Sequence, residues 1–246
     1  MEQDQPQSIE MSVEDVIRIG VEARLGQIEE ALVAQVGRVV QDGPFKGLVL
    51  APAPHAIPKI LGTYEEELWP TIAKAIERMP DVVLNIGCGE GYYAVGLKRR
   101  LPGAWVGCYD TSDKCQMECW NTAKLNDRDV SVTGAYDGDF FDESGFHRLI
   151  VMDCEGAELD YLSEANCANL GNADVIVECH DFLGQPITQI LAERLGLTHD
   201  IEVIREGGRN TAAISLLLNL GSFDRALAVQ EFRPKIMMWV VAWARR

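Results

Sequence analysis

Basic residues are scarce in this sequence, and their scarcity limits what it can bind. Lysine and arginine total 22 residues against 38 aspartates and glutamates, which gives a formal net charge of -16. A surface with this balance repels phosphate backbones, so we expect no nucleic acid partner. The acidic excess most simply serves solubility, and a preference for cationic substrates is the alternative interpretation.

Long apolar runs and paired cysteine motifs are missing as well. No apolar run approaches the ~18 residues of a membrane span, and the N-terminus, Met1 to Pro6, is acidic and polar. The seven cysteines form no C-x-x-C pair, which argues against zinc and dithiol motifs. We therefore expect a cytoplasmic protein with free thiols and no membrane partner.

The sequence also lacks the last glycine of the dinucleotide fingerprint. An apolar strand is followed by a G-x-G-x-G turn at residues 87–91, but Tyr92 stands where G-x-G-x-x-G requires its third glycine. Glycines let the backbone approach a ligand closely, and the helix that follows points its partial positive end at it. The next strand ends in Asp110, a carboxylate placed to bind two ribose hydroxyls. Together these features predict a nucleotide-like cofactor.

The remaining sequence alternates helical and apolar strand patterns. Strands are expected near residues 81–87, 105–110, 130–133, 148–153, 173–178, 201–204 and 236–243. Helices are expected at 12–39, 63–79, 92–100, 112–125, 157–165, 187–195 and 210–232, and a loop at 45–62. Apolar strands that alternate with helices indicate a parallel sheet covered on both faces. The predicted fold is α/β: a Rossmann-like, seven-stranded, mostly parallel sheet with helices on both faces and an N-terminal helical extension.

The pattern divides the chain into an extension and a domain. Residues 1–62 form the predicted N-terminal helical extension and loop, and residues 63–246 form the predicted domain, with a helical insertion near 206–234. The apolar stripe of the extension must pack on the domain, on a partner subunit or over the substrate, and a homodimer through this helix is one outcome. A capping box at 63–66 predicts a helix start, and Pro70 then kinks or restarts that helix.

The G-x-G-x-G turn followed by Asp110 resembles the first motif of class I S-adenosylmethionine (SAM) methyltransferases. Four further stretches resemble the FkbM-like branch of that family: Leu61-Gly-Thr-Tyr-Glu65, Gly89-Glu-Gly-Tyr-Tyr-Ala94, Met152-Asp-Cys-Glu-Gly-Ala-Glu158 and Val177-Glu-Cys-His-Asp181. The resemblance covers about residues 60–182. It implies SAM as the cofactor and transfer of a methyl group as the reaction.

The resemblance also implies a set of cofactor-binding residues. They are Tyr64, Asn85, Gly87, Cys88, Gly89, Gly91, Asp110, Thr111, Asp139 and Asp153. Many class I members carry an acidic residue at the position of Asn85, which can hydrogen-bond the ligand but brings no charge. Glu90, Tyr64 or Glu65 would then compensate at the ammonium group, although Glu65 can equally serve a helix start. Asp139 or Asp137 would accept a hydrogen bond from the adenine amino group, and an ordinary Asp-Gly turn is the alternative.

Methyl transfer is a direct displacement, so alignment of donor and acceptor supplies most of the catalysis. A hydroxyl acceptor must also lose its proton. His180 is the candidate general base, because its ordinary pKa lies near the working pH, and Asp153 is the second candidate catalytic residue. In the alternative interpretation Asp153 orders the cofactor and His180 binds a backbone group. Glu155 and Glu158 are assigned to a helix start and left out of the catalytic set.

A divalent metal is an open alternative at the same strand ends. Asp153, Glu178 and Asp181 would supply its oxygen ligands, and the metal would lower the pKa of the acceptor hydroxyl. SAM is the expected cofactor with or without such a metal.

The predicted function is therefore transfer of a methyl group from SAM to a small-molecule hydroxyl, on a sugar or a natural product. An NAD-dependent oxidoreductase is an alternative that is weakened by Tyr92 and by the lack of a Tyr-x-x-x-Lys pair. A non-catalytic SAM-binding protein that regulates or scaffolds a partner is another alternative.

Overall fold

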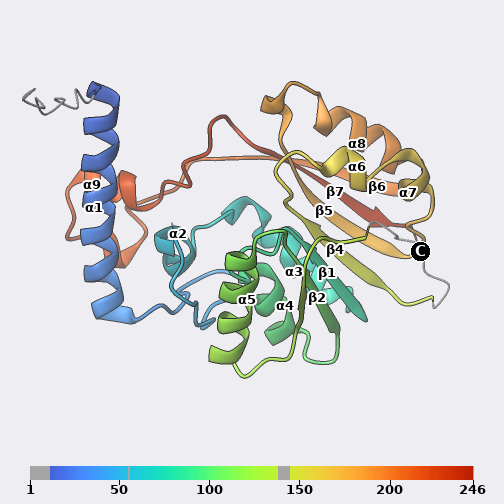
Figure 1. Ribbon diagram of the computed structural model, residues 1–246, viewed down its shortest axis with the longest axis horizontal. Coiled ribbons are helices and arrows are strands. Elements are labelled where there is room, and N and C mark those ends of the chain that lie inside the picture. Colours follow the sequence, from blue (N-terminus) through green and yellow to red (C-terminus); the bar gives the residue numbers. More distant parts are fainter. Residues whose placement is uncertain (1–11, 55, 138–144, 246) are drawn as a thin grey trace, which may run out of the picture.

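The structure, a computed structural model, describes residues 12–54, 56–137 and 145–245 (Figure 1). Across these residues one seven-stranded sheet forms, in the order β3 (Ser131–Thr133), β2 (Trp105–Tyr109), β1 (Val82–Ile86), β4 (Arg148–Met152), β5 (Ala173–Cys179), β7 (Met238–Ala244) and β6 (His199–Arg205). Strand β7 runs antiparallel to both of its neighbours, and the other pairs that contact each other are parallel. The predicted mostly parallel sheet is confirmed.

Alternate residues of the central strands point to opposite faces of the sheet, as the strand period of two requires. On β4, Leu149 and Val151 belong to one apolar cluster, and Ile150 and Met152 belong to the other. The first face is covered by α3 (Trp69–Glu77), α4 (Tyr92–Arg100) and α5 (Asp113–Leu125). The second is covered by α6 (Glu158–Tyr161), α7 (Glu164–Ala168) and α8 (Ile187–Gly196). Helices therefore cover both faces, as expected.

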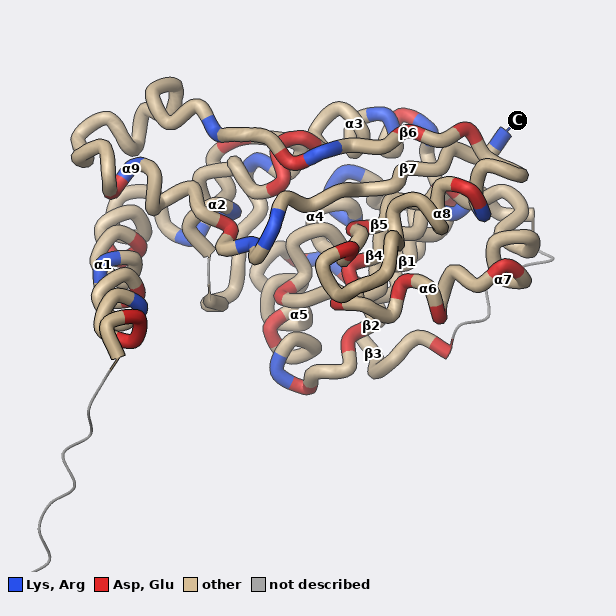
Figure 2. Tube along the Cα trace, turned by 90° about the horizontal axis from the view of Figure 1, so that it is seen from above, with Lys and Arg blue, Asp and Glu red and all other residues tan. Residues whose placement is uncertain are grey.

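The N-terminal helix α1 (Val13–Val36) packs against α9 (Ser222–Ala228), and Figures 1 and 2 show the two side by side. Ile28 and Leu32 are buried there, and the Arg24 guanidinium donates two hydrogen bonds to Asp224, at 2.9 and 2.6 Å. The C-terminal half of the stripe is thus covered by the chain itself. Its N-terminal half is exposed, with Ile17 60% accessible, so the homodimer remains a prediction.

Two of the expected segments differ from the structure near residue 60. The predicted loop at 45–62 contains a buried helix, α2 (Ala56–Leu61), and Val49 in the same segment forms an isolated bridge with Val39. The capping box does not form, because the Thr63 hydroxyl donates to the Pro58 carbonyl instead (3.4 Å). A short 3-10 helix, η1 (Glu66–Leu68), precedes α3, and Pro70 lies in the first turn of α3, where it restarts the helix.

Two further predicted helices are shorter than expected. The helix at 157–165 is divided into α6 and α7, because Ser163 accepts a hydrogen bond from the Asn166 amide (3.2 Å) and starts the second helix. Within 210–232 the helical residues are η3 (Ser215–Leu217) and α9, and the rest is extended or turn. Among the described residues no helix is both long and apolar enough to cross a bilayer.

Candidate functional site

The glycine turn joins β1 to α4 and lies directly on the end of β4. Gly87 has φ +76°, and a Cβ built on it would lie 1.6 Å from the carbonyl oxygen of Asp153. No side chain fits at that separation, so glycine is required for the ends of β1 and β4 to meet. Gly91 is the N-cap residue of α4 and is packed against Cys119.

Asp110 follows β2 and is tied to the same turn. Its carboxylate accepts hydrogen bonds from the amides of Gly89 (3.0 Å) and Ser112 (2.9 Å), which hold it in one orientation. Each carboxylate oxygen retains a second lone pair, so Asp110 can still accept from a ligand. Asp110 lines a cavity of about 180 Å³, here called the first cavity, together with Ile86, Gly87, Tyr109, Thr111, Ala135, Tyr136, Asp153, Cys154, Glu155, Ala157 and Tyr161.

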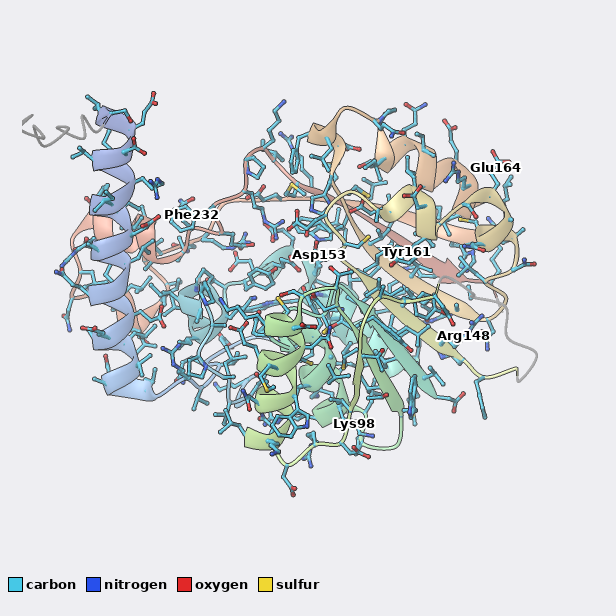
Figure 3. The ribbon with its side chains drawn as sticks, in the orientation of Figure 1. Lys98, Arg148, Asp153, Tyr161, Glu164 and Phe232 are labelled. Atoms are coloured by element: carbon cyan, nitrogen blue, oxygen red, sulfur yellow. The ribbon has the colours of Figure 1, made fainter. Side chains whose placement is uncertain are left out.

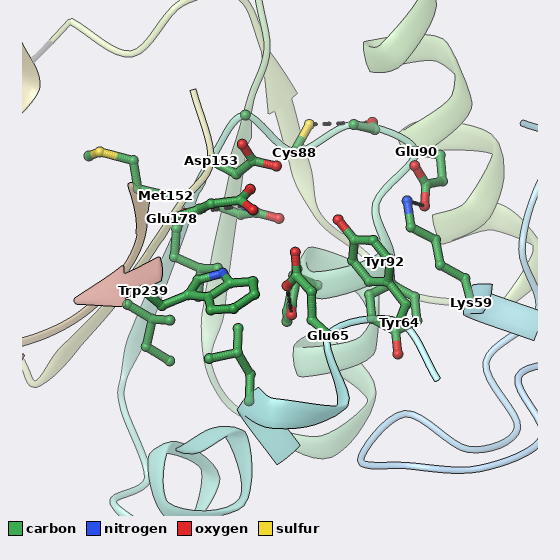
Figure 4. A pocket seen from close by; sticks show the side chains of 17 residues that line it. Lys59, Tyr64, Glu65, Cys88, Glu90, Tyr92, Met152, Asp153, Glu178 and Trp239 are labelled. Carbon is green, nitrogen blue, oxygen red and sulfur yellow. Dashed lines mark hydrogen bonds and ion pairs between the residues drawn. The ribbon is translucent and has the colours of Figure 1, made fainter. Parts of the chain in front are cut away.

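A second cavity, of about 70 Å³, also has Gly87 in its lining, and Figure 4 shows it from close by. Its polar lining includes Tyr64, Glu65, Asn85, Cys88, Gly89, Asp153 and Glu178, and Figure 4 shows carboxylates turned into the space from several sides. Asn85 donates to the Val151 carbonyl (3.3 Å), whereas its Oδ1 is buried without a hydrogen-bond partner among the described residues. The same holds for the Tyr92 hydroxyl. Because buried polar atoms are usually hydrogen-bonded, these two atoms favour a ligand that supplies the missing partner.

A third cavity, of about 180 Å³, opens beside β5. It is lined by Tyr64, Asp153, Glu155, Glu178, His180, Phe182, Glu231, Phe232, Arg233, Pro234 and Met237. Asp153 lines all three cavities. In Figure 3 it lies near the middle of the molecule, between Phe232 of the third cavity and Tyr161 of the first. Asp153 is therefore the residue that the linings of these three cavities share.

His180 is held at this point by three carboxylates. Its Nδ1 lies 2.5 Å from Oε1 of Glu158, and its Nε2 lies 3.3 Å from Glu155 and 3.7 Å from Asp153. Burial lowers the pKa of His180, but the hydrogen bond and charge of Glu158 outweigh burial, so that this pKa lies above its ordinary value. Burial and the charge of Glu65 raise the pKa of Asp153 to about 7. Asp153 therefore exchanges its proton near neutral pH.

Arg233, from the segment before β7, neutralises several of the buried acids. Its guanidinium pairs with Glu65 (2.7 Å), Glu231 (3.0 Å) and Glu178. Arg209 adds pairs with Glu231 and with Glu67, at 2.5 Å each. Two arginines thus face an excess of carboxylates, which leaves the surroundings of Asp153 short of positive charge.

The metal ligands expected from the sequence do not come together. Glu178 is paired with Arg233, and both oxygens of Asp181 bind Thr188, from its amide (2.8 Å) and its hydroxyl (2.7 Å) at the start of α8. The group whose ligand atoms lie within 4.8 Å of one another is Asp153, Glu155 and His180. A divalent cation at this edge would therefore need a different set from the predicted one, and it would include Glu155, whose side chain is 81% exposed.

Most of the predicted cofactor residues lie together around the first and second cavities. Tyr64, Asn85, Cys88 and Gly89 line the second, Thr111 lines the first, and Gly87 lines both. Asp139 lies outside the described residues. Glu90 and Glu65, both expected near an ammonium group, line the second cavity, and each is paired with a cation: Glu90 with Lys59 and Glu65 with Arg233.

Two functional candidates were not predicted from the sequence. The sequence predicts that Glu158 serves only a helix start. Its place in the Met152–Glu158 motif, just after β4, was a signal for a role in the site. Arg233 carried no such signal, because it comes from a segment without a motif and meets Glu65 only in the folded chain.

No protein-family model matches the chain, and a search of curated proteins finds no relative. Solved structures do match. A methyltransferase from Pyrococcus furiosus superposes with a TM-score of 0.52 at 13% identity, covering 91% of this chain and 97% of the other. A precorrin-6y C5,15-methyltransferase from Geobacter metallireducens superposes with a TM-score of 0.49 at 14% identity, covering 80% and 94%. A tRNA (uracil-54, C5)-methyltransferase from Pyrococcus abyssi, in complex with S-adenosyl-L-homocysteine, gives 0.41 at 12% identity, covering 72% and 38%.

At these identities the likeness concerns the fold. The Pyrococcus furiosus structure superposes over nearly the whole length of this chain, whose sheet has seven strands. This chain therefore has the Rossmann-like α/β fold of a methyltransferase.

Proposed function

We propose that this protein is a SAM-dependent methyltransferase that methylates a hydroxyl group of a small molecule. The observation that carries the proposal is that Asp153 lines three cavities. Two of them adjoin the glycine turn and suit a donor, and the third adjoins His180 and suits an acceptor. The motifs that resemble FkbM-like methyltransferases line the same cavities, which supports that finer assignment.

The residues around the first two cavities fit SAM. Asp110 would accept hydrogen bonds from the ribose hydroxyls in the first cavity. Asn85 and Glu65 would hold the amino-acid portion in the second cavity, where Asn85 Oδ1 is without a partner in the described part of the chain. A ligand that enters both cavities passes Gly87 and Asp153, which line both. When bound there, SAM supplies a methyl carbon on a positively charged sulfur, which leaves as a neutral thioether with the bonding electron pair.

The third cavity fits a small acceptor that bears no phosphate. Its volume of about 180 Å³ lies below the ~300 Å³ at which pockets for drug-sized ligands begin. The N–H groups of Arg233 are already taken by Glu65, Glu178 and Glu231, so Arg233 is poorly placed to bind an anionic group. A sugar or natural-product hydroxyl meets these conditions, whereas a nucleic acid backbone would be repelled.

His180 would remove the proton of the acceptor hydroxyl. Its Nε2 is directed toward Asp153 and Glu155, both of which line the third cavity. Burial lowers the pKa of His180, but the hydrogen bond and charge of Glu158 raise it above its ordinary value, which makes the ring a stronger base. Asp153, with a pKa of about 7, would exchange protons with it.

Substitution of Asp110 by alanine should weaken SAM binding by roughly 10- to 100-fold, because hydrogen bonds to a charged group contribute about 1.5–3 kcal/mol. Titration calorimetry on the purified variant measures the change. Asp113→Ala is the matched control, since Asp113 is an exposed aspartate at the start of α5. Equal affinities of the Asp110 variant and the parent protein would show that the first cavity is not the ribose site.

SAM affinity should rise with pH through neutrality. Asp153 is protonated below its pKa of about 7 and charged above it, and a carboxylate attracts the sulfonium, so affinity should increase about tenfold from pH 6 to pH 8. Glu65, Glu155, Arg233 and His180 face the same carboxylate, and deprotonation of His180 acts in the same direction. Calorimetry across this range checks the trend. In Asp153→Asn the pH dependence of SAM affinity should flatten. An unchanged slope would assign that dependence to another titratable group.

The proposal is tested by turnover. The protein is incubated with SAM labelled in its methyl group and with a small-molecule extract of cells, and the products are identified by mass spectrometry. We expect label in the oxygen-linked methyl group of a small molecule. Binding of SAM without any labelled product, from extracts that contain hydroxylated metabolites or nucleic acids, would support the regulatory alternative instead.

A further inference from the structure

Glu158 is buried in a manner that a helix-start residue does not require. Glu158 is 0% exposed, although it is the first residue of α6. Its Oε1 accepts from the Gly156 amide (3.0 Å) and contacts His180 Nδ1 (2.5 Å). Its Oε2 has no hydrogen-bond partner within the described residues. Because a buried carboxylate is unfavourable unless it is paired, the contact with His180 is what offsets its burial.

The same contact determines which nitrogen of His180 is available for chemistry. An ionised Glu158 can only accept, so Nδ1 carries the hydrogen and donates it to Oε1. In the neutral ring Nε2 then holds the lone pair. Nε2 lies on the side of Asp153 and Glu155, and Phe182 packs against the ring at 5.7 Å in an edge arrangement. The ring is therefore fixed both in tautomer and in direction.

We propose that Glu158 is the positioning residue for His180: it keeps the Nε2 lone pair directed into the third cavity and stabilises the imidazolium that forms there. The proton moves from the acceptor hydroxyl to Nε2, and the positive charge on the ring is balanced by Glu158 until the proton passes to water. This inference deepens the proposed function and rests on it for the reaction.

Replacing Glu158 with glutamine separates this role from support of the turn. The amide oxygen of glutamine can still accept from Gly156, whereas the charge beside His180 is lost. Glu164 provides the matched control, because it is the first residue of α7 and is exposed. Glu158→Asp retains the charge on a shorter side chain and serves as the rescue variant.

The test is a proton titration of His180 by nuclear magnetic resonance, on the whole chain with ¹⁵N-labelled histidine and without SAM. The sequence has four histidines, and His180→Gln assigns the signal. In Glu158→Gln we expect the pKa of His180 to fall, because the charge beside the ring is lost, whereas the neutral ring keeps its Nδ1–H on the amide oxygen. Glu164→Gln should leave both unchanged, and Glu158→Asp should restore at least part of the shift.

Turnover provides the second measurement. Glu158→Gln should lower the rate by between about 10- and 10³-fold, less than loss of His180 itself, and should move the pH profile of the rate with the shifted pKa. If His180 titrates identically in Glu158→Gln and in the parent protein, the positioning role is overturned. If Glu158→Gln does not fold, the tautomer of the neutral His180 ring in the parent protein decides, and a hydrogen on Nε2 instead of Nδ1 overturns the proposal. A changed titration in a protein that never transfers a methyl group would refute the proposed function alone.

Discussion

Replacing His180 with glutamine should lower the rate of methyl transfer by roughly 10²- to 10⁴-fold, the range that a general base contributes. The reason is geometric: Nε2 lies beside Asp153, which lines all three cavities, and the hydrogen bond from Nδ1 to Glu158 holds it there. SAM affinity should change by less than tenfold, because His180 lines the third cavity and neither of the others. Single-turnover kinetics with saturating SAM separate the two effects.

His199→Gln is the matched control for this prediction. His199 is also buried, but its Nε2 bonds the Ala173 carbonyl at the far end of β5. Folded His199→Gln protein should transfer methyl groups at the rate of the parent protein. A His180 variant that transfers methyl groups as fast as the parent would show that His180 is not the general base. Loss of turnover on chelation with EDTA, restored by Mg²⁺, would instead assign His180 to a cation with Asp153 and Glu155.

Gly87→Ala should abolish SAM binding and destabilise the fold. The left-handed backbone at φ +76° costs an alanine about 1–2 kcal/mol. The larger effect is the contact of 1.6 Å between the added Cβ and the Asp153 carbonyl, because both atoms belong to backbone and one strand end must move. We expect SAM affinity to fall by at least about 100-fold and thermal unfolding to begin at a lower temperature.

Gly89→Ala is the control in the same turn. Gly89 also has a positive φ, of +50°, but an added Cβ would meet nothing within 4 Å. Its fold should persist, with a loss of stability of about 1 kcal/mol. Calorimetry and thermal melts on both variants make the comparison. A Gly87 variant that melts and binds like the Gly89 variant would show that the contact with Asp153 is not what holds the turn.

The sheet could be predicted from the sequence because its central strands are short, continuous apolar runs. Val175, Ile176 and Val177 of β5 are fully or nearly fully buried, which is why no polar residue interrupts them. The site followed from the strand ends, since parallel strands deliver their last residues to one edge. Asp110 and Asp153 lie where that rule places them, on the same cavity.

The errors arose where pairing in three dimensions overrides a local pattern. Asp181 looked like a free carboxylate, but Thr188 occupies both of its oxygens seven residues later. Glu178 lies one residue before the end of β5, at Cys179, and is neutralised by Arg233, from a segment that no local signal connects to it. Residues 56–61 are helical despite Pro58, because they are buried against the sheet helices and a short helix tolerates proline near its start.

The central claim is that the cavities around Gly87 bind SAM, and calorimetry on the purified full-length protein tests it most directly. SAM and S-adenosylhomocysteine are titrated separately, followed by NADH at the same concentrations. We expect saturable heat with SAM and with its demethylated product, and none with NADH. Micromolar binding of NADH, with no heat from either SAM or S-adenosylhomocysteine, would contradict it.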